Sequence, residues 1–225
     1  MTNRAGYFSY ADGRKYKGMK LDEVFRQINE ENSWLTDANQ DSVSGPGSTS
    51  EQTRTIVESL PAILKEYQLE TILDIPCGNF NWMKRIDWTG KKYLGADILE
   101  ELVSRNSEIF QQHNISFRVL DLTRDPLPEV DLVFCRDCLV HLSFEDIGLG
   151  LDNIKKSGAR YLMSTTFPDE KVNKDIPSGG WRPLNLTAEP FGFPEPVILL
   201  NENCTEAEGL FKDKSLGMWR VIDLP

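Results

Sequence analysis

The sequence predicts an α/β fold with a seven-stranded, mostly parallel sheet that ends in an antiparallel β-hairpin. The first reason is the run 71–78, which reads as a buried strand that ends in an acid and a glycine turn. The second is the run 93–97, another apolar strand with Asp97 at its carboxyl end. The third is that five near-continuous apolar runs come first along the chain, as expected of parallel strands covered on both faces.

The predicted strands are short segments that are rich in β-branched and aromatic residues and bounded by turn residues. They span residues 71–75, 92–97, 116–121, 130–135, 159–166, 196–200 and 218–224. The link at 123–129 is too short to contain a helix. The segment between the last two strands is rich in Asn and Glu and lacks an apolar helical period, so we expect these two strands to pair antiparallel.

Helical patterns occupy residues 20–32, 51–67, 99–112 and 144–156. The third places Ile109 on an apolar face, and Ser143 is a suitable N-cap for the fourth. Pro61 should kink or split the second helix. We expect an N-terminal helical and lid segment at residues 1–50 and the main domain at residues 51–225.

The segment 42–53 joins the first two predicted helices and is rich in glycine and hydroxyl side chains. Either Thr49 with Gln52 or Ser48 with Glu51 would form a capping box for the following helix. One interpretation is therefore a linker with a helix cap. The other is a lid whose N–H groups and hydroxyls meet the charged tail of a ligand.

The composition limits the possible functions. A chain of 225 residues with 40% apolar residues can bury one sizeable core. Its net charge of −10 opposes binding to nucleic acid. No apolar run approaches the ~20 residues that span a bilayer, and the amino terminus lacks a signal-peptide core, so we expect a cytoplasmic protein without a membrane partner. The four cysteines should be reduced, and Cys135 with Cys138 lacks a second pair that would complete a zinc site.

The first two predicted strands and the turn between them form a unit that can hold a nucleoside. A glycine turn at Gly78 lets backbone N–H groups approach a ligand, and Asp97 can accept hydrogen bonds from ribose hydroxyls. A nicotinamide-dependent oxidoreductase is an alternative, but it requires a G-x-G-x-x-G turn that this chain lacks. A binding module that holds the nucleoside without turnover is a third interpretation.

Acids and a glycine turn recur at the ends of the predicted strands. They are Asp74, Pro76 and Gly78 after the first, Asp97 after the second, and Asp121 with Leu122 after the third. With the final hairpin, this pattern resembles the class I S-adenosylmethionine-dependent methyltransferases over roughly residues 50–225. Members of that family usually carry D-x-G-x-G-x-G at the turn, of which this chain keeps only Gly78 among the glycines. The resemblance implies a Rossmann-like fold, S-adenosyl-L-methionine as cofactor and S-adenosyl-L-homocysteine as product.

The same resemblance assigns roles to these residues. Asp74 and Gly78 would lie along the methionine part of the cofactor, Asp97 would bind the ribose, and Asp121 with Leu122 would bracket the adenine. An acid at a strand end is also often a helix cap, which is the alternative for Asp121. The full predicted cofactor-binding set is Ser48, Thr49, Gln52, Asp74, Gly78, Asp97, Ile98, Asp121, Leu122 and Arg136.

The predicted catalytic residues follow the fourth strand, in the run 135–142. An alcohol acceptor needs a base, because its pKa lies far above neutral pH. We expect His141 to be that base, with a pKa that Asp137 or burial displaces from ~6.5, and Asp137 to orient its imidazole. His141 could instead satisfy a neighbouring carbonyl, and Asp137 could bind a divalent metal, although no cluster of acids accompanies it.

The segment 168–194 is too long and too aromatic to be an ordinary connection, so we predict that it forms the wall of the acceptor site. Trp181 and Phe191 suit the apolar face of a sugar ring. Arg182 and Asn185 can hydrogen-bond its hydroxyls. The alternative is that these four side chains only fasten the loop to the core.

Two motifs, S-G-P-G-S-T-x-x-Q-T and C-R-D-C-L-V-H-L, are similar to those of class I methyltransferases met in glycan-building systems, including domains attached to glycosyltransferases in large viruses. This resemblance implies an O-methyltransferase that acts on a sugar hydroxyl, such as that of rhamnose, and an association with glycosyltransferase machinery. The acceptor would be a small molecule or a glycan.

Overall fold

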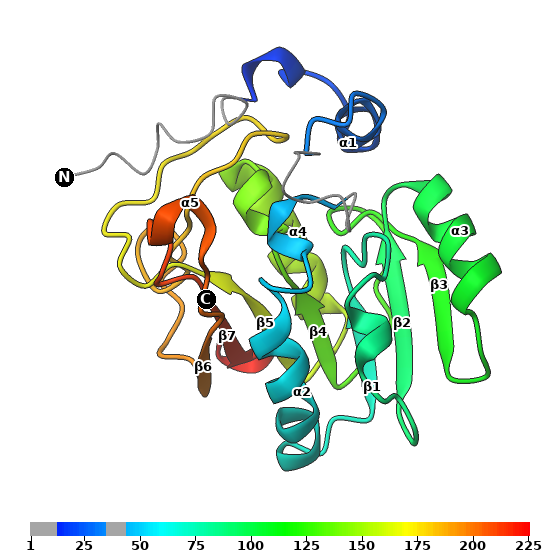
Figure 1. Cartoon of the computed structure of the whole chain (residues 1–225). Coiled ribbons are helices and arrows are strands. Elements are labelled where there is room, and N and C mark those ends of the chain that lie inside the picture. Colours follow the sequence, from blue (N-terminus) through cyan, green and yellow to red (C-terminus); the bar gives the residue numbers. More distant parts are fainter. Residues whose placement is uncertain (1–12, 35–43) are drawn as a thin grey trace.

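A computed structural model describes residues 13–34 and 44–225 of the chain, so Ser42 and Val43 of the predicted lid lie outside the described residues. Its centre is one seven-stranded sheet in the order β3-β2-β1-β4-β5-β7-β6 (Figure 1). The strands are β1 Thr71–Asp74, β2 Lys92–Asp97, β3 Ile115–Val119, β4 Leu132–Cys135, β5 Tyr161–Thr166, β6 Ile198–Asn201 and β7 Ser215–Arg220. The first five pair in parallel, and β7 pairs antiparallel with both β5 and β6. The predicted fold class is confirmed.

The last strand differs from its predicted range of 218–224. It begins at Ser215, which pairs with Thr166 of β5 and Asn201 of β6, and it ends at Arg220. The chain then turns through a short 3-10 helix, Val221–Asp223. The first residues of β7 were missed because the polar side chain of Ser215 is buried, which is unusual for that residue type.

The helices are α1 Leu21–Glu30, α2 Arg54–Glu66, α3 Glu100–Phe110, α4 Phe144–Lys156 and the short α5 Glu206–Gly209. Pro61 does not split the second helix, because α2 runs through it, and the expected kink stays a prediction. Leu60 and Leu64 of α2 are fully buried, and their packing offsets the lost backbone hydrogen bond. Ile109 is 56% exposed, so it does not belong to the buried face of α3. Ser143 caps α4 by accepting a hydrogen bond from the Asp146 N–H, as predicted.

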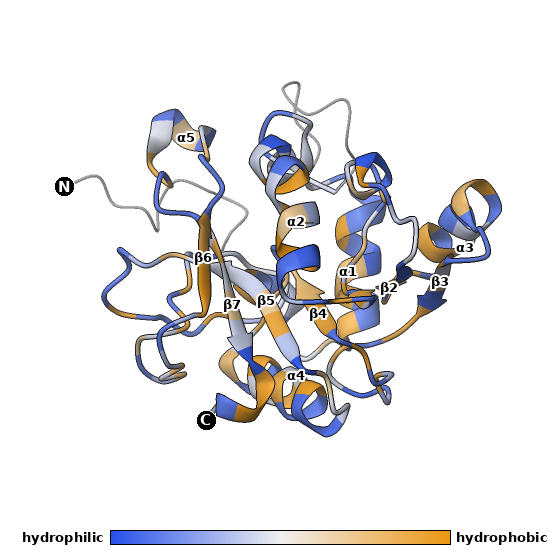
Figure 2. Cartoon of the chain, turned by 90° about the horizontal axis from the view of Figure 1, so that it is seen from below, coloured by the Kyte–Doolittle hydropathy of each residue, from blue (hydrophilic) through white to orange (hydrophobic). Residues whose placement is uncertain are grey.

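The sheet separates two hydrophobic clusters. One contains Ile147 and Ile154 of α4, and the other contains residues of α2 such as Ile56. In both views α2 and α4 lie on opposite faces of the strands (Figures 1 and 2), where the central strands carry many hydrophobic residues. The two faces are therefore covered, and the carboxyl ends of the parallel strands form the edge that remains for a ligand.

All four cysteines are free thiols, which agrees with the prediction that they are reduced. Within residues 13–34 and 44–225, no helix combines the length and the apolar character that a bilayer-spanning segment requires.

Gly217 of β7 tests how tightly the antiparallel part of the sheet is packed. A Cβ atom there would lie 2.0 Å from the indole ring of Trp219, whose Nε1 donates to the Pro194 carbonyl. Gly217→Ala should therefore lower the free energy of unfolding by about 1–3 kcal/mol in urea denaturation. The control is Gly148→Ala in α4, where a Cβ meets no atom within 4 Å. It should be neutral or stabilising by up to about 1 kcal/mol, and equal stabilities of the two variants would contradict the packing argument.

Candidate active site

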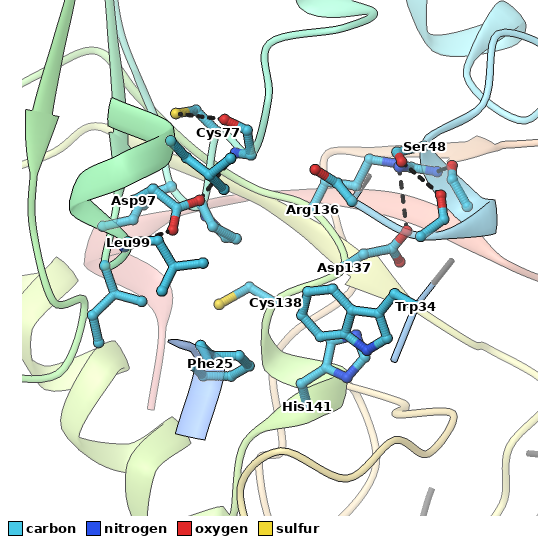
Figure 3. A pocket seen from close by; sticks show the side chains of 18 of the residues that line it. Phe25, Trp34, Ser48, Cys77, Asp97, Leu99, Arg136, Asp137, Cys138 and His141 are labelled. Atoms are coloured by element: carbon cyan, nitrogen blue, oxygen red, sulfur yellow. Dashed lines mark hydrogen bonds and ion pairs between the residues drawn. The ribbon is translucent and has the colours of Figure 1, made fainter. Parts of the chain in front are cut away.

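A cavity lies at the carboxyl ends of β1, β2 and β4, and residues of α1 and of the segment 44–48 cover it. Among the sequence-predicted site residues, those that line it are Ser48, Asp74, Gly78, Asp97, Ile98, Asp121, Leu122, Arg136, Asp137, His141 and Trp181. The close-up shows Asp97 and Leu99 on one side and Arg136, Asp137 and His141 on the other (Figure 3). The structure therefore brings both predicted catalytic residues and eight of the ten predicted cofactor residues into one cavity.

Asp97 organises the turn that follows β1. Its Oδ2 accepts a hydrogen bond from the Gly78 N–H at 3.1 Å, and its Oδ1 accepts one from the Leu99 N–H at 3.0 Å. Burial raises the pKa of Asp97 to about 6, while these backbone donors oppose the shift. Gly78 has a φ of +53°, and a Cβ there would lie 2.5 Å from the Ser44 hydroxyl oxygen. The turn therefore requires glycine at this position.

Asp74, the last residue of β1, lies beside this turn and is 3% exposed. Its carboxylate accepts a hydrogen bond from the hydroxyl of Tyr93 in β2. Burial raises the pKa of Asp74 to about 7, the Tyr93 hydrogen bond lowers it, Asp97 raises it and Arg136 lowers it. Tyr93 was not among the predicted site residues, because a tyrosine inside an apolar strand is expected to pack in the hydrophobic core.

Asp121 and Leu122 line the cavity beyond β3. Asp121 also stabilises its own turn, because its Oδ1 accepts from the N–H of Thr123 at 2.8 Å and from its hydroxyl at 2.7 Å. A capping role of this kind was the alternative that the sequence left open. It does not remove Asp121 from the cavity wall.

Five charged side chains meet between the end of β4 and the β6–β7 connection. Arg136 donates to Glu202 at 2.7 Å and to the Gly47 carbonyl at 2.8 Å, and lies 3.2 Å from Asp137. Lys214 lies 2.6 Å from Asp137 and 3.9 Å from Glu206. Burial opposes ionisation of Asp137, but Arg136 and Lys214 outweigh it and hold its pKa well below the usual range.

His141 ends the short 3-10 helix Leu139–His141, and its ring lies 5.2 Å from that of Trp34 (Figure 3). Its Nδ1 lies 2.8 Å from the Gly180 carbonyl oxygen, which can only accept, so Nδ1 carries the proton. In the neutral ring Nε2 then keeps its lone pair. Of the two displacements expected for the pKa of His141, burial is the larger and lowers it to about 4, while the charge of Asp137 raises it.

The expected role of Asp137 also changes. Its side chain accepts from Lys214 and from the Thr165 hydroxyl, and the imidazole is oriented by the Gly180 carbonyl instead. Asp137 raises the pKa of His141 only through its charge. Across residues 13–34 and 44–225, no group of three or more His, Cys, Asp or Glu side chains is arranged to hold a metal ion.

Thr49 and Gln52 do not line the cavity, so their role in cofactor binding stays a prediction. The Thr49 hydroxyl accepts from the Gln52 N–H at 3.4 Å, as in half of the expected capping box. The Gln52 amide instead exchanges two hydrogen bonds with Thr205. Gln52 therefore fastens the segment to the connection after β6.

Three residues predicted to bind the acceptor do not line the cavity either. Arg182 is buried and donates to the carbonyls of Leu139, Leu142 and Lys174. Asn185 donates to the Glu170 carbonyl at 2.9 Å, and Phe191 packs edge-on against Phe144. These side chains fasten the loop to the core, which was the alternative interpretation, and Trp181 alone of the four lines the cavity.

Sequence reasoning missed the contribution of α1 and of the β6–β7 connection. Leu21 and Phe25 of α1, Trp34 after it, and Phe211 and Lys214 of the connection all line the cavity. The amphipathic pattern of α1 was visible, but it does not say which edge of the sheet the helix covers. Lys214 carries no signal in the sequence, because its partners are distant along the chain.

Two glycines let the N-terminal segment approach the loop after β5 closely. A Cβ on Gly179, whose φ is +92°, would lie 2.6 Å from both Tyr16 and Val24. A Cβ on Gly13 would lie 2.6 Å from the Pro177 carbonyl oxygen. The same loop supplies the carbonyl of Gly180 that orients His141, so α1 and the imidazole are positioned by one segment.

Comparisons with known proteins agree with this architecture. Residues 72–157 match the model of a family described as a methyltransferase domain. Human N-acetylserotonin methyltransferase, solved in complex with SAM, aligns with a TM-score of 0.50 and 15% identity over 92% of this chain and 68% of that one. The N-methyltransferase NodS from Bradyrhizobium japonicum, solved with S-adenosyl-L-homocysteine, aligns with a TM-score of 0.49 and 16% identity over 64% of this chain and 73% of that one. Magnesium protoporphyrin IX methyltransferase from Synechocystis, solved with bound SAH, aligns with a TM-score of 0.46 and 20% identity over 70% of this chain and 71% of that one.

Other alignments are shorter. Two structures of a bacterial Hen1 methyltransferase domain align over 66% of their own length, so the chain spans about two thirds of these proteins. No curated protein sequence matches the chain significantly. The family model matches a methyltransferase domain over residues 72–157, and the similarity to N-acetylserotonin methyltransferase at 15% identity shows the fold of class I S-adenosylmethionine-dependent methyltransferases. The fold is the Rossmann-like fold of that class.

Arg182 offers a test of how the helix that carries His141 is held. Arg182→Lys keeps the charge but cannot reproduce the planar set of donors to three carbonyls. It should lower the free energy of unfolding by about 2–4 kcal/mol in urea denaturation. The matched control is Arg118→Lys at an exposed position of β3, which should change it by less than about 0.5 kcal/mol. If Arg182→Lys lowers the free energy of unfolding as little as the control does, the three carbonyls have other hydrogen-bond donors.

Proposed function

We propose that the protein is an S-adenosylmethionine-dependent O-methyltransferase that methylates a sugar hydroxyl of a glycan, such as that of rhamnose. The observation that carries the proposal is that one cavity joins the Gly78 turn and Asp97 to a neutral histidine with an available Nε2 lone pair. A nicotinamide oxidoreductase is a poorer fit to a sheet that ends in an antiparallel hairpin. The free cysteines fit a reducing compartment, in line with a cytoplasmic enzyme.

The residues present fit the cofactor. Asp97 would accept hydrogen bonds from the ribose hydroxyls, because its oxygens keep lone pairs beyond the two that bind the backbone. Ile98 and Leu122 would flank the adenine, and Asp74 would face the cationic methionine end. Ser44 leaves no room for a Cβ at position 78, so Gly78 places only backbone at the cavity wall. When bound, the cofactor supplies an electrophilic methyl group on its sulfonium.

His141 would take the proton of the acceptor hydroxyl at Nε2. Its pKa of about 4 keeps the imidazole neutral at neutral pH, so the lone pair is always available there. The same low pKa makes it a weak base, so proton transfer should accompany methyl transfer rather than precede it. The Gly180 carbonyl fixes the tautomer and stabilises the imidazolium that forms.

The acceptor would lie on the side of the cavity lined by Phe25, Trp34 and Trp181. Aromatic faces of this kind suit the apolar face of a sugar ring, which supports a sugar over a charged acceptor. The network of Arg136, Asp137 and Lys214 forms the polar rim of the same region. A glycosyltransferase that supplies the glycan is the partner we propose.

The cofactor assignment is tested first by thermal shift with SAM, S-adenosylhomocysteine and NAD. We expect the two adenosyl ligands to raise the Tm and NAD to leave it unchanged, because only a ligand of the native state stabilises it. Stabilisation by NAD alone would favour the oxidoreductase.

Asp97→Asn should then weaken SAM binding at least tenfold in calorimetry. The change keeps the side-chain shape and one of the two acceptors at the turn, but it removes charged hydrogen bonds worth about 1.5–3 kcal/mol each. Asp97→Ala is a poorer test, since it removes both acceptors of the Gly78 and Leu99 N–H groups. Unchanged affinity in a folded Asp97→Asn protein would refute the ribose assignment.

His141→Ala should reduce kcat by about 10²–10⁴ and leave the Kd for SAM nearly unchanged. Ionisation of His141 should not shape the pH–rate profile above about pH 5, because its pKa is about 4. His113→Ala, which removes the other histidine at an exposed position, is the control and should keep full activity. A His141→Ala enzyme that retains more than about half of its kcat would remove the residue from the mechanism.

A further inference from the structure

A buried tyrosine contacts Asp74, one of the acids that line the cavity. Tyr93 is 1% exposed and its hydroxyl donates to Asp74. In the β1–β2 ladder Tyr93 pairs with Ile72, and Asp74 pairs with Gly95. Residues two apart share a face of a strand, so the phenol reaches Asp74 diagonally along one face of the sheet.

Because Asp74 is buried, the hydrogen bond from Tyr93 has a large effect on whether its carboxyl group is ionised. The titratable groups that face it are Tyr93 and Asp97 from β2, Cys77 in the turn and Arg136 after β4. Burial disfavours the carboxylate most, and the strongest effect in its favour is the hydrogen bond from Tyr93, followed by the charge of Arg136. Burial and the nearby acid keep the phenol itself neutral, because they raise the pKa of Tyr93 well above its usual value. Tyr93 is therefore a permanent donor.

We propose that Tyr93 is a positioning residue that holds Asp74 ionised and turned to the cavity, so that the site attracts the cationic methionine end of S-adenosylmethionine. The inference rests on the proposed function. SAM carries two cationic groups at that end, the sulfonium and the α-ammonium, and S-adenosylhomocysteine keeps only the ammonium. A carboxylate attracts either cation, whereas a protonated Asp74 attracts neither.

Tyr93→Phe isolates the hydroxyl from the packing of the ring. The ring centroid lies 4.6 Å from that of Trp88 and 5.1 Å from that of Phe80, and phenylalanine keeps both contacts. The variant removes the donor that most favours ionised Asp74, so its pKa should rise further above about 7. Each unit of that rise reduces the ionised fraction below the pKa about tenfold.

The experiment measures the Kd for SAM by calorimetry from about pH 6 to about pH 9 in the wild type and in Tyr93→Phe. We expect binding by the wild type to tighten as the pH rises through about 7, because Asp74 becomes ionised. Tyr93→Phe should bind SAM about tenfold more weakly near pH 7 and approach the wild type near pH 9. A merely structural role would weaken binding by the same factor at every pH, and that result would overturn the proposal.

Two further variants keep the test decisive. Asp97 also titrates in this cavity, with a pKa of about 6. The conclusion therefore rests on the difference in pH dependence between the wild type and the variants, and not on the wild-type slope alone. Asp74→Asn should lose the part of the pH dependence near 7, and adding Tyr93→Phe to it should change nothing more. If Asp74→Asn keeps the wild-type pH dependence, the proposal is refuted even where Tyr93→Phe fails to fold. Tyr67→Phe removes a hydroxyl at a ring packed against Tyr161 and should bind SAM normally.

Parallel titrations with S-adenosylhomocysteine identify the cation. If Tyr93→Phe weakens both ligands alike, Asp74 holds the ammonium, and if it weakens SAM alone, Asp74 faces the sulfonium; either result supports the role of Tyr93. Failure of the wild type to bind either ligand would refute the proposed function itself. It is distinguishable from a pH-independent loss in Tyr93→Phe, which refutes only the inference.

Discussion

The buried ion pair between Arg136 and Glu202 is the interaction on which the arrangement of the site depends. It joins the end of β4 to the residue that follows β6, and the same guanidinium reaches the Gly47 carbonyl of the segment that covers the cavity. A buried pair is costly unless its remaining donors and acceptors are satisfied. Here Asp137 and Lys214 complete the set, and no side-chain N or O atom among the buried described residues lacks a partner. Three segments far apart in sequence therefore share one electrostatic centre.

The cavity shifts the pKa values of its carboxyl groups away from their values in water, and the direction of each shift follows from the neighbours of the group. Asp74 and Asp97 are buried with few cations nearby, so their pKa values rise. Asp137 is buried between Arg136 and Lys214, so its pKa falls. Carboxyl groups of the same chemistry are thus divided between Asp74 and Asp97, whose pKa values are raised toward neutral pH, and Asp137, which stays an anion.

The parts of the fold that follow from local patterns could be predicted from the sequence. The apolar runs gave β1, β2 and the other parallel strands, and the acids and the glycine at their ends gave Asp74, Gly78 and Asp97 a common edge. What depends on distant pairing could not be predicted. Lys214 is buried only because three acids surround it, and Arg182 is buried only because three carbonyls accept from it.

The contacts at Gly13 and Gly179 have a consequence for how this protein can diverge. The N-terminal segment that contains Gly13 and α1 meets the loop that carries Gly180 with no room for a Cβ on either glycine, because backbone atoms approach Gly13 and side chains approach Gly179. A different N-terminal segment could therefore replace this one only together with residues 177–181, because side chains of other sizes would clash or lose contact at Gly13 and Gly179. The two segments therefore have to change together.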